Sequence, residues 1–190
     1  MYKYLVFLFC CSAMACSQNS SSNETATHWQ YQPQHHSESL DAHCQPMVAK
    51  FQDLLKGVMN KDTAYMNTVT IEMIQHLDSF ATLDFSKDTI LNQDIKAGFN
   101  NIAGELAGIV IGISMGDESE IKMAVNMTAI QILNLLGKVG YQKQNIYIFH
   151  TADAALEDGL YWLGIQKTAK NPYHPEQKKE VEATYMLQEK

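Results

Sequence analysis

Apolar residues recur at three- and four-residue spacing through most of the chain beyond residue 46, and this periodicity predicts amphipathic helices. The first predicted helix starts at Pro46, a residue that suits a first helical turn. The second spans about 63–78, with Asp62 as its N-cap. The third and fourth span about 88–114 and 118–138. Because the link between the first two helices is short, we expect them to lie antiparallel.

Glycines recur every four residues in the second half of the third predicted helix. A glycine inside a helix costs about 1 kcal/mol relative to alanine, so close packing must offset it. The row therefore predicts that a neighbouring helix approaches closely along this face. The glycines are Gly104, Gly108, Gly112 and Gly116.

The boundaries of the fourth helix and the C-terminal third complete the predicted fold. Asp117 is expected to cap the fourth helix, and Gly137 and Gly140 to end it. Residues 145–149 (NIYIF) predict a strand, 153–163 a short helix or turn, and 176–188 a polar terminal helix. The sequence thus predicts a mostly α fold, an up-and-down four-helix bundle with a short extended segment and a C-terminal appendage.

The first fifteen residues have the pattern of an export signal. A lysine at position 3 precedes a short apolar stretch, which is too short to span a bilayer as a helix. Small residues follow, with two alanines in the A-x-A arrangement directly before Cys16. We therefore expect residues 1–15 to be a signal peptide.

The end of this signal, Ala-Met-Ala-Cys, resembles a bacterial lipobox. That resemblance implies that the Cys16 thiol is acylated and anchors the chain in a membrane. The residue after it is serine rather than aspartate, which favours the outer membrane, with the protein facing the periplasm. A simply secreted protein cut at the same bond is the alternative. The polar stretch that follows predicts a lipidated flexible tether over 16–45, ahead of a bundle domain over 46–190.

Composition and motifs exclude several functions. The 190 residues are 46% hydrophobic, enough for a core, and carry a net charge of −7. All 14 basic residues are lysines, and without arginine an acidic chain is a poor nucleic-acid binder. The chain has no G-x-S-x-G, H-E-x-x-H, P-loop or dinucleotide-binding motif, so we do not expect an enzyme.

Three motifs in the C-terminal third resemble a known family. They are Ile146–His150 (IYIFH), Gly159–Gly164 (GLYWLG) and Asn171–His174 (NPYH). In this order and spacing they resemble the bacterial domain-of-unknown-function family 3347, over about residues 46–188. The resemblance implies an exported helical domain, found alone in lipoproteins or joined to periplasmic adaptor subunits of copper and silver efflux pumps. It therefore also implies a role with soft metals.

The chain departs from that family at the residues that would bind metal. Thr151, Ala152 and Asp153 stand where the family has a Cys-Pro-Met motif, whose thiolate and thioether would suit Cu(I). Pro175 replaces the glycine after the Asn-Pro-Tyr motif, and the family's late cysteine is absent. The resemblance thus supports the fold more than the chemistry.

A histidine-rich segment before the first helix is the best candidate for metal chemistry. Imidazole together with thiolate suits copper or zinc, and a flexible segment can wrap an ion. The alternative is a solvated linker with incidental histidines. Cys44 is a metal ligand, a free thiol or half of an intermolecular disulfide. The candidate ligands are His28, His35, His36, His43, Cys44, His150 and His174.

Two functional hypotheses follow. The first is a tethered helical module that binds or passes a transition metal, copper or zinc. The second is a metal-independent module that docks onto another envelope protein through the bundle.

Methionines at helical spacing are expected to fill the core rather than bind Cu(I). They are Met59, Met66, Met73, Met123 and Met127.

Overall fold

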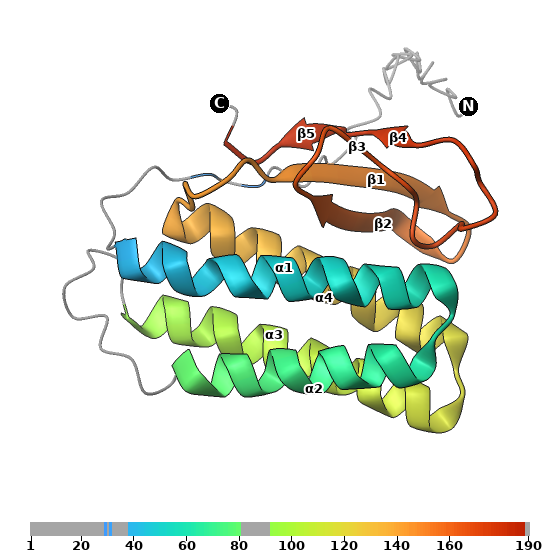
Figure 1. The fold of residues 1–190 in the computed structure, drawn as a ribbon, viewed down its shortest axis with the longest axis horizontal. Helices are drawn as coiled ribbons and strands as arrows, with labels where there is room; N and C mark the ends of the chain where they lie inside the picture. The colour runs from blue at the N-terminus through green and yellow to red at the C-terminus, as the bar shows by residue number, and fades with distance from the viewer. Residues whose placement is uncertain (1–28, 30, 32–37, 81–91, 189–190) are drawn as a thin grey trace, which may run out of the picture.

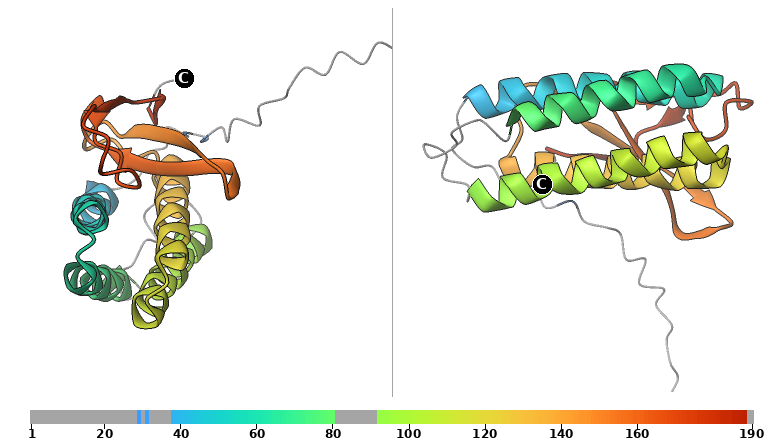
Figure 2. Two further views of the ribbon diagram at one scale, coloured as in Figure 1. Left: turned by 90° about the vertical axis from the view of Figure 1, so that its right-hand side faces the viewer. Right: turned by 90° about the horizontal axis from the view of Figure 1, so that it is seen from below.

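The computed structural model describes residues 29, 31, 38–80 and 92–188. Within these residues the chain is mostly helical, as predicted, with a small antiparallel sheet. Consecutive helices lie side by side, and the sheet covers one side of the helical layer (Figure 1, Figure 2). The helices are α1 (Glu38–Asn60), α2 (Thr63–Phe80), α3 (Asn92–Met115) and α4 (Glu118–Val139).

Helix α1 begins at Glu38, so the predicted start at Pro46 and the predicted tether boundary at residue 45 are wrong. Pro46 lies inside the helix, with its ring on the exposed side. The apolar stripe of α1 extends N-terminally of the proline through Leu40 and Cys44, both fully buried. Burial of this stripe offsets the hydrogen bond that a proline removes from a helix interior.

The predicted N-caps are confirmed. The Asp62 carboxylate accepts a hydrogen bond from the Tyr65 amide at 2.9 Å, at the start of α2. Asp117 accepts two at the start of α4, from the Ser119 and Glu120 amides at 2.9 and 3.1 Å. Each carboxylate satisfies first-turn N–H groups that have no partner within the helix.

A three-stranded antiparallel sheet replaces much of the predicted C-terminal appendage. Strands β1 (Tyr147–Asp153), β2 (Leu156–Gly164) and β5 (Tyr185–Met186) pair in the order β2-β1-β5. The predicted strand over 145–149 is confirmed in part, and the helix or turn predicted over 153–163 is wrong. The second half of β2 is buried residue after residue, as in a strand covered on both faces, so it lacks an alternating pattern.

The helix predicted over 176–188 is also wrong. This segment forms β4 (Val181–Glu182), which pairs with β3 (Thr168–Ala169), and then β5. Its backbone N–H groups bond to carbonyls of earlier residues, as Thr184 does to Ile148 at 2.8 Å. Such long-range partners leave no periodic trace in a polar segment, so the sequence pattern did not indicate them.

The glycine row on α3 is only partly an interhelical contact. Gly108 and Gly112 face α4, and a Cβ added at Gly112 would lie 2.9 Å from Ile121 Cγ1 and 3.0 Å from its backbone nitrogen. Gly104 has open space around it, and Gly116 has a φ of 67° in the turn after α3. The close approach is therefore confirmed for the middle of the row and wrong at its two ends.

Two alanine substitutions on α3 test this packing. Gly112→Ala is expected to lower the free energy of unfolding by about 1 kcal/mol or more, because the new methyl group meets the α4 backbone. Gly104→Ala, its control on the same helix, is expected to raise it by about 0.5–1 kcal/mol through helix propensity alone. Urea unfolding followed by circular dichroism measures both. Equal shifts in the two variants would contradict the close α3–α4 contact.

Candidate functional site

The described part of the chain contains four of the seven predicted metal ligands. Cys16 and the ligands His28, His35 and His36 lie outside the described residues. His43 is half-buried on α1, with its ring edge-on to Phe80 at 5.2 Å. The described residues include no group of three or more His, Cys, Asp or Glu side chains that could hold a metal ion.

Cys44 is a free thiol inside the helical core. Its side chain is fully buried. Burial raises the pKa of the Cys44 thiol, and the negative charge of Asp41 raises it further. Because metals bind the thiolate, this environment opposes ligation by Cys44. Of the three alternatives for Cys44, the structure favours the free thiol.

The two C-terminal histidines lie on the sheet side of the molecule and have partners within the protein. His150 on β1 has Nε2 3.0 Å from the Asp158 carbonyl oxygen, and its ring lies 4.6 Å from that of Tyr161. His174 has Nδ1 3.2 Å from a carboxylate oxygen of Glu176. Metal binding by the remaining histidines stays a prediction.

Two aromatic residues of the predicted tether contact the folded domain. Trp29 lies edge-on to Tyr161 of β2, with ring centroids 6.0 Å apart. The Tyr31 hydroxyl donates to the carbonyl of Gly140, the residue that ends α4 with a φ of 62°. Both side chains are half-buried against the core. The domain therefore holds the chain at points that precede α1.

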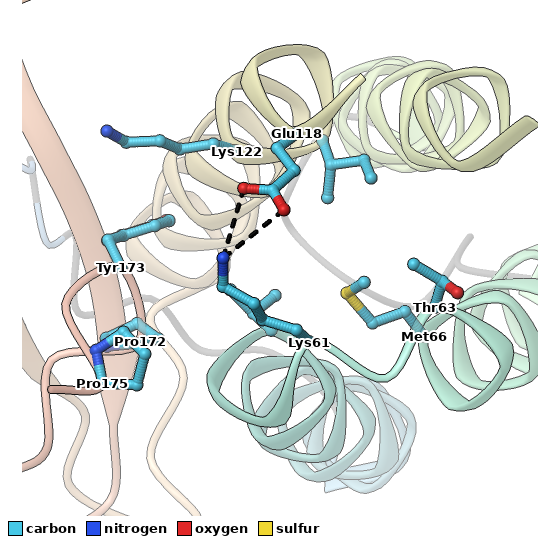
Figure 3. A pocket seen from close by; sticks show the side chains of 10 residues that line it. Lys61, Thr63, Met66, Glu118, Lys122, Pro172, Tyr173 and Pro175 are labelled. Atoms are coloured by element: carbon cyan, nitrogen blue, oxygen red, sulfur yellow. Dashed lines mark hydrogen bonds and ion pairs between the residues drawn. The ribbon is translucent and has the colours of Figure 1, made fainter. Parts of the chain in front are cut away.

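A pocket opens at the end of the bundle where three distant segments meet (Figure 3). The segments are the α1–α2 turn, the first turns of α4, and the loop at residues 172–175. We call it the bundle-end pocket; its volume is about 170 Å³ and its lining is mostly apolar. It is lined by Val58, Lys61, Thr63, Met66, Glu118, Ile121, Lys122, Pro172, Tyr173 and Pro175.

Tyr173 forms a fixed wall of the bundle-end pocket. Its hydroxyl donates to the Tyr161 carbonyl at 3.0 Å, and its amide donates to the buried Asn171 side chain at 3.0 Å. Its ring lies edge-on to Trp162, with centroids 6.0 Å apart. Burial raises the pKa of Tyr173, so the phenol stays neutral at physiological pH. The Asn-Pro-Tyr motif thus positions this wall.

Lys61 stands at the rim of the pocket in an unusual backbone conformation. Its φ is 51°, in the left-handed region, and its amide donates to the Val58 carbonyl at 3.1 Å as α1 ends. A residue other than glycine pays about 1–2 kcal/mol for this conformation. Its Nζ lies 3.3 and 3.4 Å from the two Glu118 carboxylate oxygens. Both side chains are largely exposed, and such surface pairs contribute only about 0–1 kcal/mol.

Lys122, the second cation of the lining, is held differently. It donates a hydrogen bond to Asp153 of β1 and so lowers the pKa of that carboxyl group. In Figure 3 its ammonium points away from Lys61. Sequence reasoning did not single out either lysine, because neither belongs to a motif. Of the pocket residues it named Pro172, Tyr173 and Pro175 with the C-terminal motif, and Met66 as a core methionine.

Comparison with protein-family models finds no match to this chain. Comparisons with curated proteins and with solved structures find none either. The resemblance to family 3347 therefore rests on the three C-terminal motifs alone and stays a prediction. No helix among the described residues is both long and apolar enough to cross a membrane.

Proposed function

We propose that this protein is an exported lipoprotein, anchored through Cys16 in the outer membrane and facing the periplasm. The signal-like first fifteen residues and the lipobox-like end before Cys16 support this location. The up-and-down four-helix bundle with its sheet would then be the periplasmic part, held near the membrane by the N-terminal segment.

We further propose that the bundle is a metal-independent binding module rather than an enzyme, with the bundle-end pocket as its binding site. One observation carries this proposal: three segments far apart in the sequence converge on an open, mostly apolar pocket with charged groups at its rim. Concave apolar surfaces with a few polar groups are where proteins usually bind small groups. The absence of any catalytic motif in the sequence supports binding over catalysis.

Methionine-methyl NMR tests the binding site, because Met66 lines the pocket and other methionines report elsewhere. We expect N-acetyl-L-leucinamide, a soluble apolar probe, to shift the Met66 methyl signal in a saturable way. The signal of Met186 in β5, which pairs with β1, is the internal control and should not move. Met66→Leu assigns the signal. No saturable shift at Met66 with apolar probes of this size would refute the pocket as the site.

Acyl labelling in a bacterial host tests the anchor. The wild-type chain should incorporate labelled palmitate and partition with membranes. The Cys16→Ser variant should do neither, because it lacks the thiol that carries the lipid. An unlabelled wild-type protein recovered from the soluble periplasm would favour the simply secreted alternative.

A copper or zinc site in the N-terminal segment is the second candidate function. The contacts of Trp29 and Tyr31 favour it, because these two residues stand among the histidines in the sequence and lie against the domain. His28 adjoins Trp29 in the sequence, and His35 and His36 follow Tyr31 within five residues. The buried position of Cys44 means that such a site would depend on imidazoles rather than on the thiol.

Tryptophan fluorescence tests this second candidate. If the histidines bind Cu(II), the bound ion should quench Trp29, and the triple variant His28→Gln, His35→Gln, His36→Gln should lose the quenching. Trp29→Phe shows which part of the signal comes from Trp29, since the chain has only two tryptophans. His174→Gln is the matched control. Quenching that neither saturates nor depends on the three histidines would refute the metal site.

A further inference from the structure

We propose that the bundle-end pocket binds the carboxyl terminus of a peptide whose last residue has an apolar side chain. This inference rests on the binding site proposed above and names its ligand. The apolar side chain would enter the pocket, and the terminal carboxylate would pair with Lys61 at the rim.

The size and lining of the pocket fit one apolar side chain. Its volume is about 170 Å³, and cavities of roughly 150 Å³ hold a single benzene-sized molecule. Met66, Ile121 and Val58 supply apolar surface from α2, α4 and α1, and the two prolines and Tyr173 close the other side. A longer chain would leave most of its surface in water.

The rim of the pocket favours an anion. Of the two lysines in the lining, Lys122 pairs with Asp153 and points away, so Lys61 is the cation at the mouth of the pocket. A cation beside an apolar pocket is complementary to an apolar group that carries a negative charge.

Glu118 indicates how the ligand's carboxylate would sit. Both of its carboxylate oxygens lie within 3.4 Å of Lys61 Nζ, across the mouth of the pocket (Figure 3). The Glu118 side chain is 81% exposed, so it can turn into water and leave Lys61 to an incoming carboxylate. The pair of Lys61 with Glu118 is exposed, whereas its pair with the ligand's carboxylate would be covered by the bound side chain. Covering an ion pair lowers the local dielectric constant and so strengthens the attraction.

The backbone at Lys61 agrees with a binding role. Glycine would end α1 at this position without strain, since φ is 51°. The turn itself gains little from the lysine side chain, because the pair with Glu118 is exposed. A role for the ammonium group explains why a strained residue other than glycine stands here.

A peptide terminus fits better than a fatty acid. Lys61 lies at the mouth of a pocket sized for one side chain, so the carboxylate must sit close to the apolar group. In a C-terminal residue the carboxylate and the side chain leave the same carbon atom, whereas a fatty acid separates its carboxylate from the chain end by the length of the chain. A lysine ammonium donates charge-assisted hydrogen bonds to a carboxylate.

Three probes and two lysine variants of the full-length chain test the inference by Met66 methyl NMR. We expect N-acetyl-L-leucine to bind about fivefold or more tightly than N-acetyl-L-leucinamide, which lacks the charge, and more tightly than hexanoate. Lys61→Gly relieves the backbone strain, so the variant should fold at least as stably and should bind the acid and the amide equally. Lys56→Met, which removes an exposed lysine of α1 that pairs with Asp53, is the matched control and should keep the preference for the acid.

Each failure has its own signature. Equal binding of acid and amide by the wild-type chain, or a preference for the acid that survives Lys61→Gly, would overturn the carboxylate inference while leaving the pocket as a binding site. Hexanoate binding as tightly as N-acetyl-L-leucine would overturn the peptide terminus in favour of a fatty acid. No shift at Met66 with any probe would refute the binding site itself.

Discussion

In the middle of α4, the side-chain oxygen of Asn126 accepts a hydrogen bond from the backbone N–H of Tyr161 at 2.7 Å, and both residues are buried. This bond joins the helical layer to β2. The carbonyl of the same tyrosine accepts from the hydroxyl of Tyr173, and its ring contacts Trp29. The position of this one strand residue therefore also sets the contacts of Tyr173 in the pocket wall and of Trp29. A buried amide without its partner would cost the desolvation of that group, so the arrangement has little freedom.

The position of Tyr161 also relates the two candidate functions to each other. On one side it contacts Trp29, which adjoins the histidine-rich segment; on the other it bonds to Tyr173, which lines the bundle-end pocket. Trp29 and Tyr173 thus share Tyr161 as a neighbour, although they lie far apart in the sequence. The two candidate sites are also chemically distinct, since the pocket lining contains neither histidine nor cysteine.

The fate of Cys44 illustrates how a residue that is chemically attractive in the sequence can serve packing alone. A lone cysteine after four histidines has the composition of a soft-metal site. In the structure it continues the apolar stripe of α1 between Leu40 and Met47, all three within 1% of complete burial. Sulfur in that environment behaves as a small hydrophobic group.

Two of the five methionines expected in the core, Met66 and Met73, are buried, while Met123 is 44% exposed.

Local patterns determined the helices. The three- and four-residue periodicity located all four to within a few residues at most ends, and Asp62 and Asp117 cap two of them as expected, because caps and apolar stripes depend on neighbours in sequence. The exception is the start of α1, where Pro46 resembled a first turn although buried Leu40 and Cys44 carry the helix past it.

Only the tertiary structure decided the C-terminal third and the pocket. Strands β4 and β5 form because residues of this last segment find partners in earlier strands, as the Thr184 amide finds the Ile148 carbonyl, and no local pattern indicates such pairing. The pocket exists because the turn at Lys61, the start of α4 and the loop of Tyr173 meet at one end of the bundle. No pattern within any one of these segments indicates that it meets the other two. Their meeting depends on helix lengths and on the placement of the sheet, which long-range packing sets and local propensity does not.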